Sequence, residues 1–247
     1  MDSAMFPRQP NQSVIDGLLV LQTLTAAAHP IGSRELARQL GLEPTRVNRL
    51  AKTLAGLGFL QQAADRKYAV GPGVHVLAAQ ALHASGLLRA ALPALETLHP
   101  LGHTVSMGVI WRSQVCYLYH WHPGMSSAEA VGMSDLFPAA DSGIGHALLA
   151  RLAEEEVRLQ HPAVPASLLP RLAEVKERGW AFIPRRSEAV VAVALGDVPP
   201  AAIALAGPFS KTEAHRLIKP LRVAAAAILD SLNAYQQTIQ KKEPPCP

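Results

Sequence analysis

Cysteine and aromatic residues are scarce in this sequence. Two cysteines among 247 residues exclude a fold held together by a disulfide framework, and they suit a reducing compartment. Aromatic residues make up 5% of the chain, so Ala, Leu and Val must fill any core. Hydrophobic residues make up 49% and charged residues 17%, a balance that excludes wholesale disorder and is sufficient for one large domain or two smaller ones.

Long apolar runs are also absent. The apolar stretch 223–229 is far shorter than the roughly 20 residues that a membrane-spanning helix needs. The first 11 residues are polar and contain no apolar segment of the kind found in signal peptides. We therefore expect a cytoplasmic protein that makes no contact with a membrane.

Acidic residues are missing from one informative segment, residues 44–58. The formal net charge of the whole chain is only +4, so the location of the charge matters more than its sum. Residues 1–70 contain eight Lys and Arg against five Asp and Glu, which places most of the excess near the amino end. A cationic segment of this kind permits a nucleic-acid partner.

Helical periodicity and turn residues predict a winged helix-turn-helix over residues 13–71. Three helices are expected, over residues 13–28, 34–40 and 44–57. Gly41 is placed to end the second helix, and Pro44 is placed in the first turn of the third. A hairpin with its turn at residues 63–66 follows the third helix, as a wing follows a recognition helix.

The outer face of the third predicted helix carries the side chains that DNA recognition needs. Arg and Asn can make paired hydrogen bonds to guanine and adenine edges, whereas other polar and cationic side chains suit phosphates. The residues expected to read bases are Thr45, Arg46, Asn48 and Arg49. The residues expected to contact mainly phosphate are Lys52, Arg66 and Lys67, and Ser33 and Arg34 complete the expected DNA-binding set. A solvated helix face is the alternative for a lone stripe, but the helix order, glycine turn and basic hairpin together favour DNA binding.

An Ala-rich helix over residues 72–86 is expected to join this domain to a second one over residues 87–240. In the second domain, strand and helix patterns mix without strict alternation, which predicts an α+β fold with a mainly antiparallel sheet. Ser210 and Glu213 form a capping box for a long final helix. Residues 1–12 and 241–247 are expected to be a disordered arm and a flexible tail.

The order and spacing of these motifs resemble the IclR-type transcriptional regulators. In the amino-terminal part the resemblance rests on Ser13, Val14, Leu18, Leu21, Glu35, Leu36, Ala37, Gly41, Leu42, Val47, Arg49, Leu50, Thr53, Leu54, Gly58, Tyr68 and Gly71. In the second part it rests on Pro138, residues 142–145 and 148–150, Gly179, Trp180, Gly207 and Pro208. The resemblance implies a sequence-specific DNA-binding regulator that is a homodimer or tetramer, with a linker helix that helps to pair the DNA-binding domains.

The same resemblance implies a GAF-like carboxy-terminal domain that binds a small-molecule effector, often an organic or aromatic acid, beside the turn at residues 142–145. The implied effector-binding residues are Phe137, Asp141, Ser142, Gly143, Ile144, Val190, Ala204 and Ala206. Asp141 stands where a small residue is common, His146 replaces the usual Lys, and Ala204 and Ala206 stand where hydroxyl side chains are common. These departures predict a more apolar pocket, or a ligand other than a simple carboxylate, and a vestigial pocket is the alternative.

A metal site is a further alternative for the second domain. Cys116, His120 and His122 are separated by even numbers of residues on one predicted strand, so their side chains would face the same side of the sheet. Cys and His together suit zinc. Because residues four or six apart on a strand are far apart in space, only the two histidines could share an ion, helped by His146 or Asp141 from elsewhere. Edge or loop histidines are the simpler interpretation, and we expect no resident metal or cofactor.

Enzymatic and purely protein-binding functions are the remaining classes. The turn at residues 142–145 lacks the strand and the preceding glycine of a nucleophile elbow, and residues 71–73 lack the lysine of a phosphate loop. No nucleophile is paired with a base, so we expect no enzyme activity. An interaction module that packs through the Ala-rich segment 224–227 is less favoured than a regulator.

Overall fold

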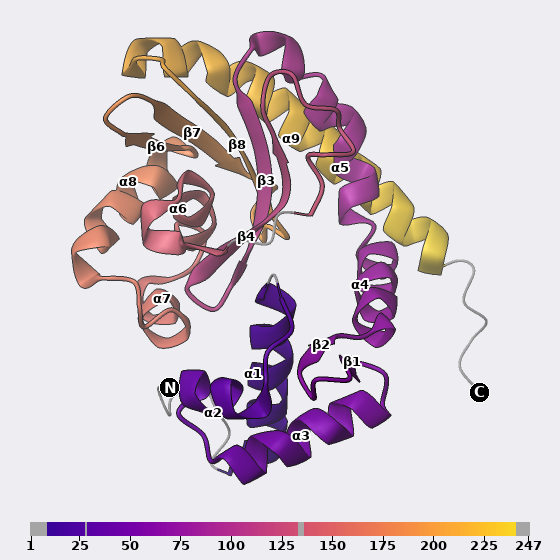
Figure 1. Ribbon diagram of the computed structural model, residues 1–247. Coiled ribbons are helices and arrows are strands. Elements are labelled where there is room, and N and C mark those ends of the chain that lie inside the picture. Colours follow the sequence, from indigo (N-terminus) through magenta and orange to yellow (C-terminus); the bar gives the residue numbers. More distant parts are fainter. Residues whose placement is uncertain (1–8, 28, 133–135, 241–247) are drawn as a thin grey trace. The chain divides into compact units, whose positions relative to one another are not determined.

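The computed structural model describes residues 9–27, 29–132 and 136–240 (Figure 1). The chain divides into two compact units, the first ending at Ala84 and the second beginning at Ser85. Most of the predicted arm and all of the predicted tail, residues 1–8 and 241–247, lie outside the described residues. Within the described part of the chain, no helix has the length and apolar character needed to cross a bilayer.

The first unit has the element order of a winged helix-turn-helix. Its elements are α1 (Gln12–Ala26), α2 (Ser33–Leu40), α3 (Pro44–Gly56), β1 (Leu60–Gln62), β2 (Tyr68–Val70) and α4 (Pro72–Ser85). α2 ends at Gly41, whose φ of +64° is a left-handed conformation that glycine adopts without strain. Pro44 occupies the first turn of α3, where its missing N–H costs no helical hydrogen bond. The predicted helix boundaries are therefore confirmed to within about two residues.

A small apolar core holds the first unit together. Its most deeply buried members include Val20, Leu24, Leu36, Val47, Ala51, Leu60 and Tyr68. Leu18, which shares helical spacing with Leu21 and Leu24, does not join this core, because its side chain is 60% exposed. The buried stripe instead recurs every four residues through Asp16, Val20 and Leu24, so a carboxylate lies on the inner side of the helix.

Among its described residues, the second unit contains six strands and the helices that pack on them. The strands are β3 (Thr104–Trp111), β4 (Gln114–Trp121), β5 (Leu136–Pro138), β6 (Ala181–Pro184), β7 (Ala189–Ala194) and β8 (Ala202–Gly207). The α-helices are α5 (Leu87–Glu96), α6 (Gly143–Leu149), α7 (Glu154–Gln160), α8 (Leu169–Arg178) and α9 (Lys211–Gln240). The strands pair antiparallel throughout in the order β5-β4-β3-β8-β7-β6, which confirms the predicted α+β fold.

Helices cover both faces of this sheet and form two separate cores (Figure 1). α5 and α9 pack on one face, where Val191 and Leu205 are fully buried. α6 and α8 pack on the other face, where Ala192 and Ala204 leave room for α6 to approach closely. Because α6 begins with Gly143, whose added Cβ would meet Val190 Cγ1 at 2.7 Å, the helix rests almost directly on β7.

A β-bulge interrupts the alternation of β4. Met107 pairs with Tyr119 and Gly108 pairs with Tyr117, so Leu118 has no partner on β3. An extra residue reverses which face the following side chains point to. Tyr117 therefore packs in the α6 core, whereas Tyr119 packs in the α5 and α9 core.

One short strand was not anticipated from the sequence, and one prediction was met closely. β5 is a three-residue edge strand, too short to give a periodic signal. The predicted capping box at the start of α9 is confirmed, because Ser210 N and Oγ donate to Glu213 Oε2 while Glu213 N donates to Ser210 Oγ.

Candidate functional sites

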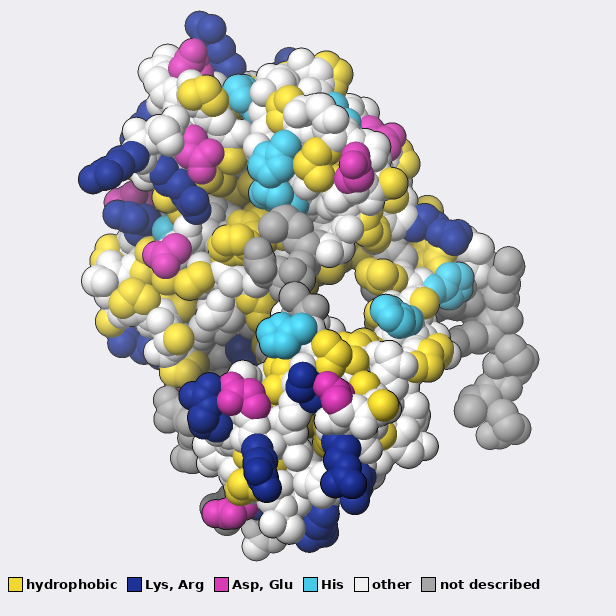
Figure 2. Space-filling model, in the orientation of Figure 1, with side chains coloured by type: hydrophobic (Ala, Val, Ile, Leu, Met, Phe, Trp, Pro, Cys, Tyr) yellow, Lys and Arg dark blue, Asp and Glu magenta, His cyan; other side chains and the backbone are white. Residues whose placement is uncertain are grey.

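The outer face of α3 is accessible, as a DNA-reading helix requires. Thr45, Arg49 and Lys52 are exposed and Asn48 is half-buried, while Val47 packs beneath them in the core. α3 contains no acidic residue in its first turn or elsewhere. Figure 2 shows Lys and Arg side chains gathered over the helices and hairpin of the first unit. The surface is thus cationic and open where the sequence predicted contact with a duplex.

Arg46 differs from the other predicted base-reading residues because it is held within the unit. Its Nε lies 2.6 Å from Oδ2 of Asp16 on α1, and the arginine side chain is 41% exposed whereas that of Asp16 is 2% exposed. The second carboxylate oxygen, Oδ1, accepts a hydrogen bond of 2.7 Å from Gln12 Nε2. The sequence interpretation missed Asp16, although its place on the stripe with Val20 and Leu24 could have shown that it faces the core.

The hairpin between β1 and β2 presents the predicted phosphate contacts at its tip. Arg66 and Lys67 are exposed, and Arg66 has a φ of +63°, which turns the chain back into β2. Lys67 Nζ lies 3.1 Å from Asp65 Oδ2, and hydrogen bonds from Lys67 lower the pKa of that carboxyl group. Outside the hairpin, Arg34 at the start of α2 is exposed and Ser33 is half-buried.

Close backbone contacts fix the hairpin to its surroundings. Gly71 N donates to Phe59 O at 2.8 Å, and Gly73 N donates to Gly58 O at 2.9 Å. A Cβ added to Gly71 would lie 2.5 Å from Gly58 O, so only glycine allows the two backbone segments this approach. The end of β2 and the start of α4 are therefore tied to the segment that follows α3.

A cavity of roughly 440 Å³ opens in the second unit beside the start of α6. It is lined by Tyr117, Phe137, Pro138, Ala140, Asp141, Ser142, His146, Arg171, Ile183 and Arg185. Three of the predicted effector-binding residues, Phe137, Asp141 and Ser142, thus line it together. Five others do not: Gly143, Ile144, Val190, Ala204 and Ala206 pack in or against the core between α6 and the sheet.

The cavity is more cationic than the sequence predicted. Arg171 comes from α8 and Arg185 directly follows β6, and both side chains were missed because they lie far from the turn in the sequence. Arg185 Nη2 donates to Asp141 O at 3.1 Å, and its Nη1 lies 3.7 Å from Glu188. The wall of this cavity thus combines guanidinium groups with aromatic rings, and the two arginines were not part of the pocket that the sequence predicted.

Polar groups inside the cavity are held in defined positions. Ser142 caps α6 by accepting from Gly145 N at 3.3 Å, and its Oγ lies 3.3 Å from the hydroxyl of Tyr117. His146 is buried, and its Nε2 lies 2.6 Å from Ala140 O while its Nδ1 has no hydrogen-bond partner. Burial lowers the pKa of His146, so the imidazole is neutral at pH 7.

A row of hydroxyl and imidazole groups crosses the α6 face of the sheet. His120 Nδ1 lies 2.8 Å from Ser106 Oγ, and His122 Nδ1 lies 2.9 Å from Thr104 Oγ1. Ser106 pairs with Ala204 in the sheet, and Thr104 pairs with Ala206. The hydroxyl groups that the sequence lacks at positions 204 and 206 are thus present one strand away, on β3.

The bulge in β4 contradicts the expectation that Cys116 shares a face with the two histidines. Cys116 pairs with Val109, which belongs to the α5 and α9 core, whereas His120 pairs with Ser106 on the α6 side. Strict alternation along the sequence assigns Cys116 to the wrong face of the sheet, because Leu118 is an extra residue in β4. No group of three His, Cys, Asp or Glu side chains converges as a metal site among the residues that the structure describes.

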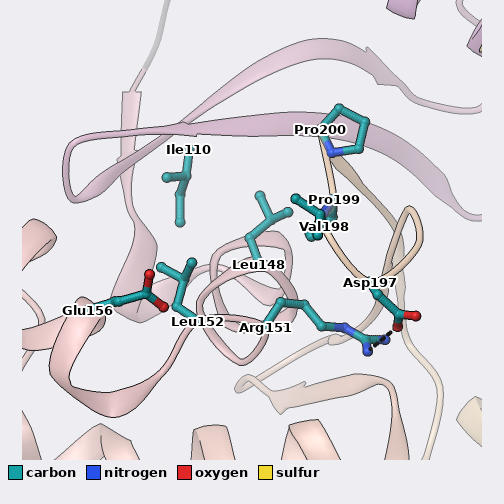
Figure 3. Close-up of a pocket in the computed structure, with 9 residues that line it drawn as sticks. All are labelled: Ile110, Leu148, Arg151, Leu152, Glu156, Asp197, Val198, Pro199 and Pro200. Atoms are coloured by element: carbon teal, nitrogen blue, oxygen red, sulfur yellow. Dashed lines mark hydrogen bonds and ion pairs between the residues drawn. The ribbon is translucent and has the colours of Figure 1, made fainter.

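A second cavity, of roughly 350 Å³, lies at the other end of α6 (Figure 3). Leu148 and Leu152 point into it together with Ile110 and Val198, and the turn between β7 and β8 closes one side. Its arginine is already paired, since Arg151 Nη1 lies 3.2 Å from Asp197 Oδ1. The cavity therefore offers an apolar hollow with no uncommitted arginine.

The amino-terminal part of the chain matches the IclR helix-turn-helix domain over residues 13–64. Over 231 residues the chain is 28% identical to the transcriptional repressor IclR of Escherichia coli (strain K12), and the match covers 83% of each protein. The HTH-type transcriptional regulator TsaQ1/TsaQ2 of Comamonas testosteroni is 35% identical over 43% of this chain and 38% of its own length.

Solved structures share the fold over most of the chain. An ICLR transcriptional regulator from Silicibacter sp. TM1040 superposes with a TM-score of 0.74 at 24% identity, over 89% of this chain and 96% of that one. An IclR homolog from Microbacterium hydrocarbonoxydans, crystallised with 4-hydroxybenzoate, gives a TM-score of 0.70 at 21% identity, over 90% of this chain and 99% of that one. Both units of the chain thus have counterparts in proteins of one architecture.

Proposed function

Because this chain is an IclR-type transcriptional regulator, we propose that it reads a specific duplex through α3 while its hairpin contacts the backbone. The observation that carries this proposal is the accessible, acid-free outer face of α3, with Thr45, Arg49 and Lys52 exposed above a buried Val47. Arg49 forms no ion pair among the described residues, so its guanidinium can donate two hydrogen bonds to a guanine edge. Lys67 at the hairpin tip is a point charge suited to phosphate.

Selection of bound duplexes from a random pool tests this proposal, followed by affinity measurements on the selected and on random DNA. Arg49→Ala should relax the preference at one base pair by about 1–3 kcal/mol. Lys67→Ala should weaken binding to all duplexes alike and reduce the salt slope by about one unit. Lys211→Ala, an exposed lysine in the second unit, is the matched control and should change neither. Equal effects of Arg49→Ala and Lys67→Ala on selected and random DNA would contradict the assigned roles.

Pairing of two chains through α4 is part of the same proposal. A single winged helix reads few bases, so two copies over a pseudo-palindromic site give the specificity that a regulator needs. α4 has no buried residue, and Val76 and Leu77 are 54% and 51% exposed, an apolar surface suited to a second copy. Leu77→Asp should shift the mass measured by light scattering towards the monomer, whereas the exposed substitution Gln80→Asp should not.

We further propose that the cavity beside α6 binds an organic anion that controls DNA binding in the cytoplasm. Two guanidinium groups, Arg171 and Arg185, face a wall in which the Tyr117 and Phe137 rings are 5.2 Å apart. An arginine guanidinium can donate two hydrogen bonds to a carboxylate, and the aromatic rings can pack against a planar apolar group of the same ligand. A ligand favouring one quaternary arrangement would shift the population that fits the operator.

Titration calorimetry with 4-hydroxybenzoate and with a small dicarboxylate tests the cavity directly. Arg171→Ala should weaken binding of either acid by roughly tenfold or more, because a charge-assisted pair is lost. Arg158→Ala, an exposed arginine on α7, is the control and should leave binding unchanged. Saturable binding that Arg171→Ala does not weaken would remove the cavity from the proposal.

A further inference from the structure

The contact between Asp16 and Arg46 joins the inside of the first unit to its DNA-facing helix. Asp16 is on α1 and is 1% exposed, so its carboxylate has almost no access to water. A buried carboxylate persists as a charge only where partners compensate it. Oδ1 accepts a hydrogen bond of 2.7 Å from Gln12 Nε2, whereas Oδ2 accepts no hydrogen bond from the described residues and is compensated by the Arg46 guanidinium, whose Nε lies 2.6 Å away as an ion pair.

The atom that Arg46 uses for this contact leaves its outer end available. Nε is the guanidinium nitrogen nearest to the aliphatic stem, and the two terminal nitrogens carry four further N–H donors. The arginine side chain keeps 41% of its surface exposed, on the third residue of a helix whose neighbours Thr45 and Arg49 are open to solvent. Paired donors at the end of an arginine are the groups that recognise guanine.

We propose that Asp16 is a positioning residue for specificity, which holds Arg46 in one orientation for base recognition and neutralises its charge towards non-specific phosphate. This inference rests on the proposed DNA-reading role of α3. A free arginine must lose rotamer freedom on binding, whereas one fixed by Asp16 has already lost it. The neighbouring carboxylate also removes the net positive charge that would otherwise attract any DNA backbone.

The test is a comparison of wild type, Asp16→Asn, Arg46→Met and the double variant on a selected duplex and on random duplexes. Asp16→Asn preserves the side-chain shape, and removal of a buried charge should not unfold the domain. We expect it to lower affinity for the selected duplex roughly tenfold while affinity for random DNA stays level or rises. Its salt slope on random DNA should steepen by about one unit, because Arg46 becomes an uncompensated cation.

The double variant shows whether Asp16 acts through Arg46. Once Arg46 is Met, the change Asp16→Asn should alter neither the preference nor the slope. The matched control is Asp65→Asn, which frees the charge of Lys67 on the hairpin and should strengthen binding to both kinds of duplex equally. Should Arg46→Met alone fail to fold, the comparison of wild type with Asp16→Asn on selected and random duplexes still tests the positioning role, because equal weakening of both would contradict it.

The outcomes separate this inference from the proposed function. Equal weakening of selected and random binding by Asp16→Asn, or an undiminished effect of Asp16→Asn beside Arg46→Met, would overturn the positioning role while DNA recognition stands. A wild-type protein with no preference for any selected duplex would overturn the proposed function, and the positioning role with it.

Discussion

Replacement of Arg46 by Ala should destabilise the first unit far more than replacement of Arg49 by Ala, although both arginines lie on α3. Arg46→Ala leaves the carboxylate of Asp16, 1% exposed, without its cation. Loss of one partner from a fully buried pair costs about 3–5 kcal/mol, whereas an exposed pair contributes about 0–1 kcal/mol. Because Arg46 is 41% exposed, water can partly replace it, and we expect a loss of about 2–3 kcal/mol.

Amide hydrogen exchange measures this difference in the full-length chain, where two units make a single melting curve hard to interpret. A loss of about 2–3 kcal/mol corresponds to an increase of roughly 30- to 150-fold in the exchange rates of core amides in α1 and α3. Arg49→Ala should change those rates less than about twofold, since surface substitutions usually stay within 0.5 kcal/mol. Asp16→Asn combined with Arg46→Ala should recover most of the protection. Equal protection in Arg46→Ala and Arg49→Ala would refute the reasoning.

Three further predictions concern other contacts. Gly71→Ala should destabilise the first unit by roughly 1–3 kcal/mol, because the added Cβ would lie 2.5 Å from Gly58 O. The same exchange experiment measures this loss. Gly32→Ala is the control and should cost less, because the space around its Cβ is open. Ser210→Ala should lower the free energy of unfolding of the second unit by about 1 kcal/mol, read as loss of protection at the start of α9. Burial lowers the pKa of His146 below its usual 6.5, so stability should fall as the pH drops below about 6.5, and His146→Gln should flatten that dependence in urea unfolding.

The sign of the histidine prediction follows from proton binding. With its pKa lowered in the folded state, His146 binds fewer protons when folded than when unfolded at mildly acidic pH. Its contribution to stability is therefore complete above the unfolded pKa and is lost as the pH falls through the folded one. A pH dependence that is unchanged in His146→Gln would assign the acid sensitivity to other buried histidines such as His161, whose pKa is also lowered by burial.

The first unit was predictable because its signals are local. Gly41 ends α2 through a left-handed φ that few other residues adopt, and Pro44 opens α3 at a position that tolerates proline. The stripe containing Val47 and Ala51 fixes which side of α3 faces outwards. The whole order of helices and hairpin follows from such features within a few residues of one another.

The cavity in the second unit was only partly predictable because its walls come from distant segments. Phe137, Asp141 and Ser142 adjoin one turn and were identified together, but Arg171 and Arg185 arrive from α8 and β6. Neither arginine belongs to a motif, and a single sequence gives no measure of which side chains the fold brings together. Asp16 was missed for a different reason, since apolar periodicity was traced through leucines and not through a paired carboxylate.

Because Leu118 is an extra residue, β4 contributes large side chains to the cores on both faces of the sheet. Upstream of it, Val115 and Tyr117 contribute to the wall beside α6, and downstream of it Tyr119 and Trp121 contribute to the opposite layer. Regular pairing of Leu118 with β3, without the bulge, would turn every later side chain of the strand over. The imidazole of His120 would then face a hydrophobic interior, while the rings of Tyr119 and Trp121 would crowd the cavity side, so the bulge itself keeps each of these side chains in its proper layer.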